Sequence, residues 1–141
     1  MTTQQARKQK TILCVDDDAN MLKAECRMLR GLPYRVLAAS SGDEAIRVAC
    51  EKKPDLILCD VMMPGMDGYE VLMRLREVGL TETPVVMLTA KGASASLLKG
   101  YEAGAVCYIT KPFRNEQVLN VVEYLIGDLS PEARERLERI L

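Results

Sequence analysis

Five short apolar segments, separated by stretches of helical periodicity, constrain this chain more than any other feature of its sequence. Four of the five are almost continuously apolar, which is typical of strands covered on both faces. Strands that alternate with helices imply right-handed crossovers and a parallel sheet with helices on both of its faces. The sequence therefore predicts a three-layer α/β fold. The apolar segments are Ile12–Val15, Val36–Ala39, Leu56–Cys59, Val85–Leu88 and Val106–Ile109.

The intervening segments carry start and stop signals for five helices. Ser41 with Glu44 forms a capping box that opens the second helix. Asp67 with Glu70 marks the start of the third. Apolar residues at i, i+4, i+7 and i+8 predict the fifth, which Gly127 closes. The two remaining helices are predicted around Leu22, Cys26 and Leu29, ending at Gly31, and over about residues 94–103.

Two end segments fall outside this α/β unit of residues 11–127. Residues 1–10 are basic and are predicted to be a disordered lead-in. In residues 128–141, Ser130 and Pro131 predict the first turn of a short C-terminal helix. This segment is interpreted either as a helix docked on its own domain or as a linker toward an output domain.

Composition excludes several classes of function. The chain of 141 residues has a net charge of −1, which offers no overall basic field for binding nucleic acid directly. No apolar run approaches the roughly 20 residues needed to span a membrane. The absence of histidine excludes Ser-His-Asp triads, histidine zinc ligands and a phosphohistidine on the chain itself. Five scattered cysteines without a C-x-x-C pair indicate buried thiols and a cytoplasmic protein rather than a disulfide framework.

Polar residues stand where the apolar segments end. The first segment runs into Asp16-Asp17-Asp18, the third into Asp60, the fourth into Thr89, and the fifth leads to Lys111. Open parallel sheets bind ligands beyond the carboxyl ends of their strands, where the winding reverses. In a flavodoxin-like strand order of 2-1-3-4-5, that point lies between the first and third strands. The aspartates are therefore expected to meet there.

This set of residues predicts a divalent metal ion. Asp16, Asp17 and Asp60 carry −3 and Lys111 carries +1, which leaves −2 for one divalent cation to neutralise. Oxygen ligands without histidine or a well-placed cysteine favour Mg²⁺, with Mn²⁺ as the alternative. Metal, a hydroxyl and an ammonium group together suit a phosphoryl group, and they indicate Mg²⁺-dependent phosphoryl transfer.

The same segments resemble the receiver (CheY-like) domain of two-component response regulators. The resemblance covers about residues 11–127 and includes every diagnostic position in order. It implies a five-stranded, doubly wound sheet with five helices, to which the short C-terminal helix is added. The segments that carry it are Ile12–Asp18, Asp55–Gly68, Val85–Ala90 and Tyr108–Phe113.

The resemblance also implies a role for each site residue. Asp60 is the expected phosphoacceptor, phosphorylated from a phosphohistidine on a sensor histidine kinase or a phosphotransfer protein. Asp17 and Asp60 are expected to bind Mg²⁺ directly, Asp16 through water, and Met62 through its carbonyl oxygen. Lys111 is expected to pair with the phosphoryl oxygens. The chain would then be a phosphoacceptor signalling domain that catalyses only its own phosphorylation and dephosphorylation.

A conformational switch is implied as well. Thr89 is expected to move toward the phosphoryl group, and Tyr108 to turn inward into the vacated space. The face made by the fourth helix, fifth strand and fifth helix would then change its preference for an output domain, a target protein or a second copy of the chain. The Lys111–Pro112 peptide bond is expected to be cis, as in receivers generally.

Two other chemistries fit parts of the pattern. Ile12–Asp18 also matches the D-x-D signature of haloacid-dehalogenase-type phosphotransferases, with Asp16 as nucleophile and Asp18 as acid, although Asp60 is then unexplained. Asp18 is alternatively a cap of the first helix. A flavin-binding flavodoxin would need a phosphate loop after the first strand, where the three aspartates would repel a phosphate.

Overall fold

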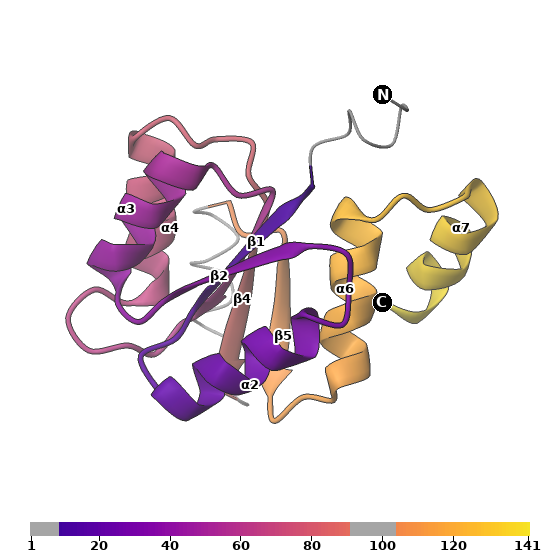
Figure 1. Ribbon diagram of the computed structural model, residues 1–141, viewed down its shortest axis with the longest axis horizontal. Coiled ribbons are helices and arrows are strands. Elements are labelled where there is room, and N and C mark those ends of the chain that lie inside the picture. Colours follow the sequence, from indigo (N-terminus) through magenta and orange to yellow (C-terminus); the bar gives the residue numbers. More distant parts are fainter. Residues whose placement is uncertain (1–8, 91–103) are drawn as a thin grey trace.

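Strands and helices alternate along the chain, of which the computed structural model describes residues 9–90 and 104–141. The five strands form one parallel sheet in the order β2-β1-β3-β4-β5, as predicted (Figure 1). The helix predicted at 94–103 and most of the predicted lead-in lie outside the described residues. The described elements are β1 (Thr11–Val15), α2 (Ala19–Leu29), β2 (Arg35–Ala39), α3 (Gly42–Lys52), β3 (Leu56–Asp60), α4 (Gly68–Glu77), β4 (Val85–Ala90), β5 (Cys107–Lys111), α6 (Asn115–Ile126) and α7 (Pro131–Ile140).

The helices cover both faces of the sheet, which confirms the three layers. Helices α3 and α4 lie together on one side, and α2 and α6 lie on the other (Figure 1). Side chains of β1 alternate between the two cores, since successive residues of a strand point to opposite faces. Leu13 and Val15 pack with α3 and α4, whereas Ile12 and Cys14 pack with α2 and α6.

Three strands extend further toward their carboxyl ends than their apolar segments predict. Strand β3 includes Asp60, β4 includes Thr89, and β5 starts one residue later than predicted and reaches Lys111. The reason is backbone pairing, which does not depend on side-chain polarity: the ladder between β4 and β5 continues to the pair of Ala90 and Lys111. Asp60, Thr89 and Lys111 therefore sit on strand ends, whereas Asp16 and Asp17 follow β1 in the loop that leads to α2.

Side-chain caps fix where the helices begin. Asp18 accepts a hydrogen bond from the backbone N–H of Asn20 at 2.9 Å, and Asp67 accepts one from Glu70 at 2.9 Å. Ser41 Oγ likewise caps α3 through the N–H of Glu44, at 3.2 Å. Such caps satisfy N–H groups that have no partner within the helix. The predicted helix starts at Ser41 and Asp67 are confirmed. No helix of the described residues is long and apolar enough to cross a membrane.

The start of α4 presses against the end of β3, because Gly68 has no side chain. Its N–H donates to the carbonyl oxygen of Val61 at 2.9 Å. A Cβ atom added at Gly68 would lie 2.6 Å from the backbone oxygen of Asp60 and 2.8 Å from Met87 Cε. This close approach holds the backbone just after the acidic strand end in place.

Replacing Gly68 by alanine is expected to lower the free energy of unfolding by about 1–3 kcal/mol, because the methyl group forces backbone atoms apart. Urea denaturation followed by circular dichroism measures the effect. Gly31→Ala is the matched control, since the nearest atom to its added Cβ lies 3.8 Å away. Equal stability of the two variants would contradict this account of the α4 start.

Candidate functional site

The carboxyl ends of four strands bring the predicted site residues together at one edge of the sheet. Strands β1 and β3 pair so that Asp16 and Asp60 reach the same level on neighbouring strands. Strand β4 contributes Thr89 and β5 contributes Lys111, one residue pair apart along their ladder. The place where the strand order reverses, between β1 and β3, is thus lined by carboxylates.

Three carboxylates form the centre of the site. Asp16 and Asp60 are only 1% and 6% exposed, whereas Asp17 is exposed. One oxygen from each of the three lies within 4.8 Å of the others. Asp18 points away from this cluster and caps α2, while its own N–H donates to Asp16 Oδ1 at 2.9 Å. The chain therefore orients Asp16 through the loop that starts α2.

Lys111 lies between two of these carboxylates. Its Nζ donates to Asp60 Oδ1 at 3.0 Å and to Asp16 Oδ2 at 3.4 Å. Burial alone would lower the pKa of Lys111, but the hydrogen bond and charge of Asp60 and the charge of Asp16 raise it. Burial is the main cause that raises the pKa of Asp60, with Asp16 adding to it and Lys111 opposing it. One ammonium group therefore only partly compensates the buried negative charge.

The donor set suits a hard divalent cation. The three carboxylates and Lys111 leave the net charge of −2 that the sequence predicts. Oxygen ligands in this number are typical of Mg²⁺ or Mn²⁺. The backbone N–H of Met62 donates to the carboxylate of Asp60 and acts to lower its pKa. The role of the Met62 carbonyl oxygen as a metal ligand stays a prediction.

Thr89 and Tyr108 lie on the same face of neighbouring strands. Thr89 is buried in β4, and its hydroxyl is 3.5 Å from the carbonyl oxygen of Ala90, a long hydrogen bond. Tyr108 is half-buried in β5 opposite Met87, and it packs against the core on the side of α3 and α4. Because Thr89 is two residues after Met87, it points to that same face. The Lys111–Pro112 peptide that follows is cis, as predicted.

Comparison with known proteins identifies the family of this chain. The chain matches the family model of the response regulator receiver domain over residues 12–123. The chain belongs to the response regulator receiver family. This receiver is 44% identical over 115 residues to the transcriptional regulatory protein ResD of Bacillus subtilis. It is 42% identical over 123 residues to the phosphate regulon transcriptional regulatory protein PhoB of Pseudomonas aeruginosa.

The matched regions cover different shares of this chain and of its relatives. The matched regions cover 82% and 86% of this chain but only 47% and 54% of ResD and PhoB. The receiver thus spans about half the length of the curated relatives it matches. The solved structure of the chemotaxis protein CheY4 of Vibrio cholerae resembles it with a TM-score of 0.80 at 29% identity, covering 84% of this chain and 100% of that one.

The haloacid-dehalogenase alternative is not favoured. It leaves Asp60 without a role, yet Asp60 is buried beside Asp16 and shares Lys111 with it. Its acid, Asp18, is instead the N-cap of α2. The family match and the acidic pocket both support a two-component receiver.

Glu25 is a feature of the site that the sequence analysis does not predict. Its side chain on α2 is 2% exposed, and neither carboxyl oxygen has a hydrogen-bond partner among the described residues. Burial, followed by the charge of Asp16, outweighs the opposing charge of Lys111 and raises the pKa of Glu25 to about 8. The sequence contains a signal for the burial of Glu25. This residue occupies the i+3 position of an otherwise apolar i, i+3, i+4, i+7 stripe that starts at Leu22.

Proposed function

We propose that this receiver accepts a phosphoryl group on Asp60 from the phosphohistidine of a sensor histidine kinase or a phosphotransfer protein. A carboxylate oxygen of Asp60 forms the new P–O bond while the P–N bond to the imidazole breaks. The observation that carries the proposal is the 3.0 Å contact of Lys111 Nζ with Asp60 Oδ1, beside two further carboxylates. It places a cation where negative charge gathers on the phosphoryl oxygens.

Asp16, Asp17 and Asp60 would hold Mg²⁺, or Mn²⁺ in its place, together with the carbonyl oxygen of Met62. When bound, the ion would supply positive charge that stabilises the phosphoryl oxygens. Asp16 and Asp17 hold their carboxylates toward the nucleophile, and Lys111 keeps Asp60 Oδ1 fixed. In this proposal the receiver acts as a catalyst only on itself, in its own phosphorylation and dephosphorylation.

Phosphorylation would be read out through Thr89 and Tyr108. Among the described residues the Thr89 hydroxyl makes one long hydrogen bond, to Ala90, so it can be redirected to a phosphoryl oxygen at little cost. Tyr108 shares the same face of the sheet and is half-buried, so it can follow. The phosphoryl group then shifts a two-state equilibrium of the surface around β5 and α6, since it interacts differently with the two states.

Acetyl phosphate and intact-protein mass spectrometry test this function. We expect one added phosphoryl group in the presence of Mg²⁺ and none when the metal is removed by a chelator. Reduction of the acyl phosphate with borohydride, followed by peptide mapping, is expected to mark Asp60. A folded receiver that binds Mg²⁺ but takes up no phosphoryl group, at any time point, would contradict the proposal. Modification at Asp16 would instead support the phosphotransferase alternative.

The proposed partners follow from the family and from the length of its members. A histidine kinase or phosphotransfer protein supplies the phosphoryl group, and an output domain or target protein reads the β5–α6 surface. Dimerisation through this surface is proposed as well. No direct contact with nucleic acid or membrane is proposed for this segment. The five free cysteines support a cytoplasmic location, where thiols stay reduced.

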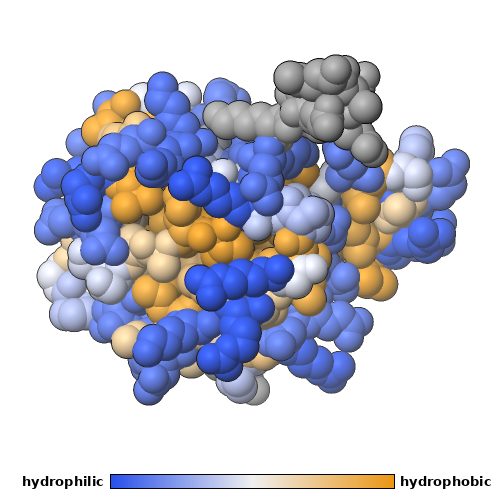
Figure 2. All heavy atoms as spheres, in the orientation of Figure 1, coloured by the Kyte–Doolittle hydropathy of each residue, from blue (hydrophilic) through white to orange (hydrophobic). Residues whose placement is uncertain are grey.

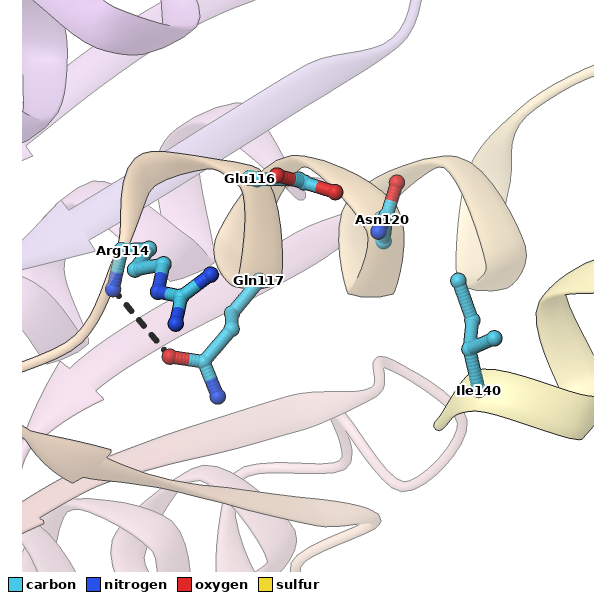
Figure 3. Close-up of a pocket in the computed structure, with 5 residues that line it drawn as sticks. All are labelled: Arg114, Glu116, Gln117, Asn120 and Ile140. Carbon is cyan, nitrogen blue, oxygen red and sulfur yellow. Dashed lines mark hydrogen bonds between the residues drawn. The ribbon is translucent and has the colours of Figure 1, made fainter.

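Helix α7 lies beside this partner surface. Tyr124 of α6 donates from its hydroxyl to Glu138 at 2.8 Å, and Arg134 donates to the Tyr124 carbonyl oxygen at 2.9 Å while stacking on its ring. Figure 2 shows hydrophobic side chains where α7 meets α6. Ile140 lines a cavity of about 430 Å³ opposite residues of α6 (Figure 3). Together with Leu141 it also lines a second cavity, to which Tyr108 contributes.

These contacts are few, and no residue of α7 is buried. Arg134→Ala is therefore expected to speed amide hydrogen exchange in α7 roughly tenfold, because it removes a hydrogen bond and a cation–π contact. Exchange in the buried strands should not change. Arg136→Ala, an exposed arginine of the same helix, is the control and should leave α7 exchange unaltered. Equal exchange in the two variants would show that Arg134 does not hold α7 in place.

A further inference from the structure

Two cysteine thiols that the phosphorylation site does not use meet between β1 and α2. Cys14 lies on the face of β1 that α2 covers, and Cys26 lies in the inward stripe of α2. The two side chains pack in the same buried cluster, and the interaction of their thiols is the largest cause that raises the pKa of Cys14 and lowers that of Cys26. Cys14 is fully buried, whereas Cys26 is 6% exposed. One thiol of the pair is therefore within reach of solvent and the other lies directly behind it.

The surroundings of Cys26 are positively charged. It lines a cavity of about 430 Å³ between α2 and strand β2, and Lys23, Arg27 and Arg30 line the same cavity. No acidic side chain of the described residues contributes to that lining. An electropositive, partly accessible setting favours the thiolate, which is the reactive form of cysteine.

The titration of Cys26 agrees with this geometry. The interaction with the Cys14 thiol and the charge of Arg30, against the effect of burial, lower the pKa of Cys26 to about 7. The carboxyl group of Glu25, which is next to Cys26 in the chain, is neutral over the same range because of its own raised pKa. Cys26 is thus the nucleophile of the pair, since it is the thiol that reaches the basic cavity, and Cys14 is the thiol enclosed behind it.

We propose that Cys26 is a site of reversible oxidation by small hydroperoxides, with Cys14 as the resolving thiol. The Cys26 thiolate attacks one peroxide oxygen, the O–O bond breaks, and Cys26 becomes a sulfenic acid while hydroxide, or an alkoxide, leaves. The Cys14 sulfur then attacks the Cys26 sulfur, the S–O bond breaks, and the Cys14 proton leaves with the oxygen as water. The two thiols are oxidised by two electrons and the peroxide is reduced by two.

The resulting disulfide would join β1 to α2 and close a loop that contains Asp16 and Asp17. Oxidation therefore acts on the backbone segment that carries two of the three carboxylates. Transient disulfides of this kind are compatible with a reducing compartment, where structural disulfides are not. Two other cysteines lack this combination of a partner thiol and access to solvent. Cys59 is fully buried, and burial and the charge of Asp60 raise its pKa. Cys50 is exposed, without a second thiol beside it among the described residues.

Hydrogen peroxide added to the reduced protein, without metal, tests the proposal. Alkylation under denaturing conditions is expected to find three free thiols in place of five, and peptide mapping is expected to find Cys14 linked to Cys26. A dithiol reductant should restore all five. Cys50→Ser is the matched control and should still form the link. In Cys14→Ala, a sulfenic acid should persist on Cys26 and react with dimedone.

Three results would overturn the proposal. These are a link between other cysteines, a chain that keeps five free thiols in excess peroxide, and a Cys26 that remains reduced while Cys50 is oxidised. If Cys14→Ala does not fold, Cys14→Val keeps the volume of the buried side chain and serves the same purpose. The mapping of the linked peptide needs no variant and decides the question by itself.

Discussion

Replacing Asp60 by asparagine is expected to abolish phosphorylation by acetyl phosphate and, in metal-free buffer, to stabilise the fold. The amide cannot form an acyl phosphate, so the loss should be complete. The stabilisation arises because Asp60 is buried, with a pKa that burial and the charge of Asp16 raise. Removing one of two neighbouring buried carboxylates is expected to raise the free energy of unfolding on the order of 1 kcal/mol, typical of functional sites whose charges oppose folding.

The size of the stabilisation by Asp60→Asn depends on pH. Because the pKa of Asp60 is raised in the folded state, the wild type loses stability as pH rises through that pKa, and Asp60→Asn does not. The gain should therefore shrink in acid, where the carboxyl group of the wild type is protonated. Mg²⁺ should reverse the order of stability, since the wild type binds it more tightly.

Intact-protein mass spectrometry measures the loss of phosphorylation, and urea denaturation measures the gain in stability. Asp67→Asn is the matched control: it changes a nearby aspartate that caps α4, and asparagine caps helices equally well. It should be phosphorylated like the wild type and unfold at the same urea concentration. A phosphoryl adduct on Asp60→Asn that maps to Asp16 would mean that the nucleophile has been assigned to the wrong strand.

The sequence predicted most of the fold because its signals are local. Apolar runs, capping residues such as Ser41 and Asp67, and glycine near helix ends each act within a few residues. The site followed from topology: once β1 and β3 are neighbours, Asp16 and Asp60 must meet at their carboxyl ends. Lys111 could be placed for the same reason. The sequence did not predict how far β5 extends, because its backbone pairing with β4 continues through Thr110 to Lys111.

Glu25, Cys14 and Cys26 were beyond the sequence because their properties come from packing between elements. A glutamate in a helix is usually solvated, and only the way α2 packs on the sheet buries Glu25 near Asp16. Both cysteines were interpreted from the sequence simply as buried thiols, and both are buried, but Cys26 also reaches a cavity. The basic cavity around Cys26 depends on three side chains that the helix periodicity alone does not place against it.

Glu25→Leu is expected to stabilise this receiver more than any other single change considered, and most strongly at alkaline pH. Glu25 has a pKa of about 8 in the folded chain, against 4.5 ordinarily. Between these values the folded chain keeps a proton that the unfolded chain has lost, so stability falls as pH rises through this window. One pKa unit corresponds to about 1.4 kcal/mol, so the full penalty above about pH 9 is roughly 4–5 kcal/mol.

The neutral carboxyl group also carries a cost, since its two oxygens have no partner among the described residues. Leucine removes both penalties and suits the apolar stripe of α2. We therefore expect Glu25→Leu to gain about 2–3 kcal/mol near pH 5.5 and about 6–7 kcal/mol near pH 9, as the sum of the ionisation penalty and the cost of the unpaired oxygens. Urea denaturation at the two pH values, with a chelator present, measures the difference from the wild type. Cys26, whose lowered pKa acts in the opposite direction, is present in both proteins, and its charge is one of the smaller causes that raise the pKa of Glu25.

Glu25→Gln separates the charge of this side chain from its burial. Glutamine keeps the shape and the unpaired polar atoms but cannot ionise. It should therefore gain about 1.4 kcal/mol near pH 5.5, one pH unit above the ordinary pKa, and about 4–5 kcal/mol near pH 9. Repeating the denaturation with Mg²⁺ is a further test, because a cation among Asp16, Asp17 and Asp60 offsets the charges that raise the pKa of Glu25. The alkaline penalty of the wild type should then shrink. Gains that are the same at both pH values would show that Glu25 is already ionised in the folded receiver, and that something other than its buried charge limits stability.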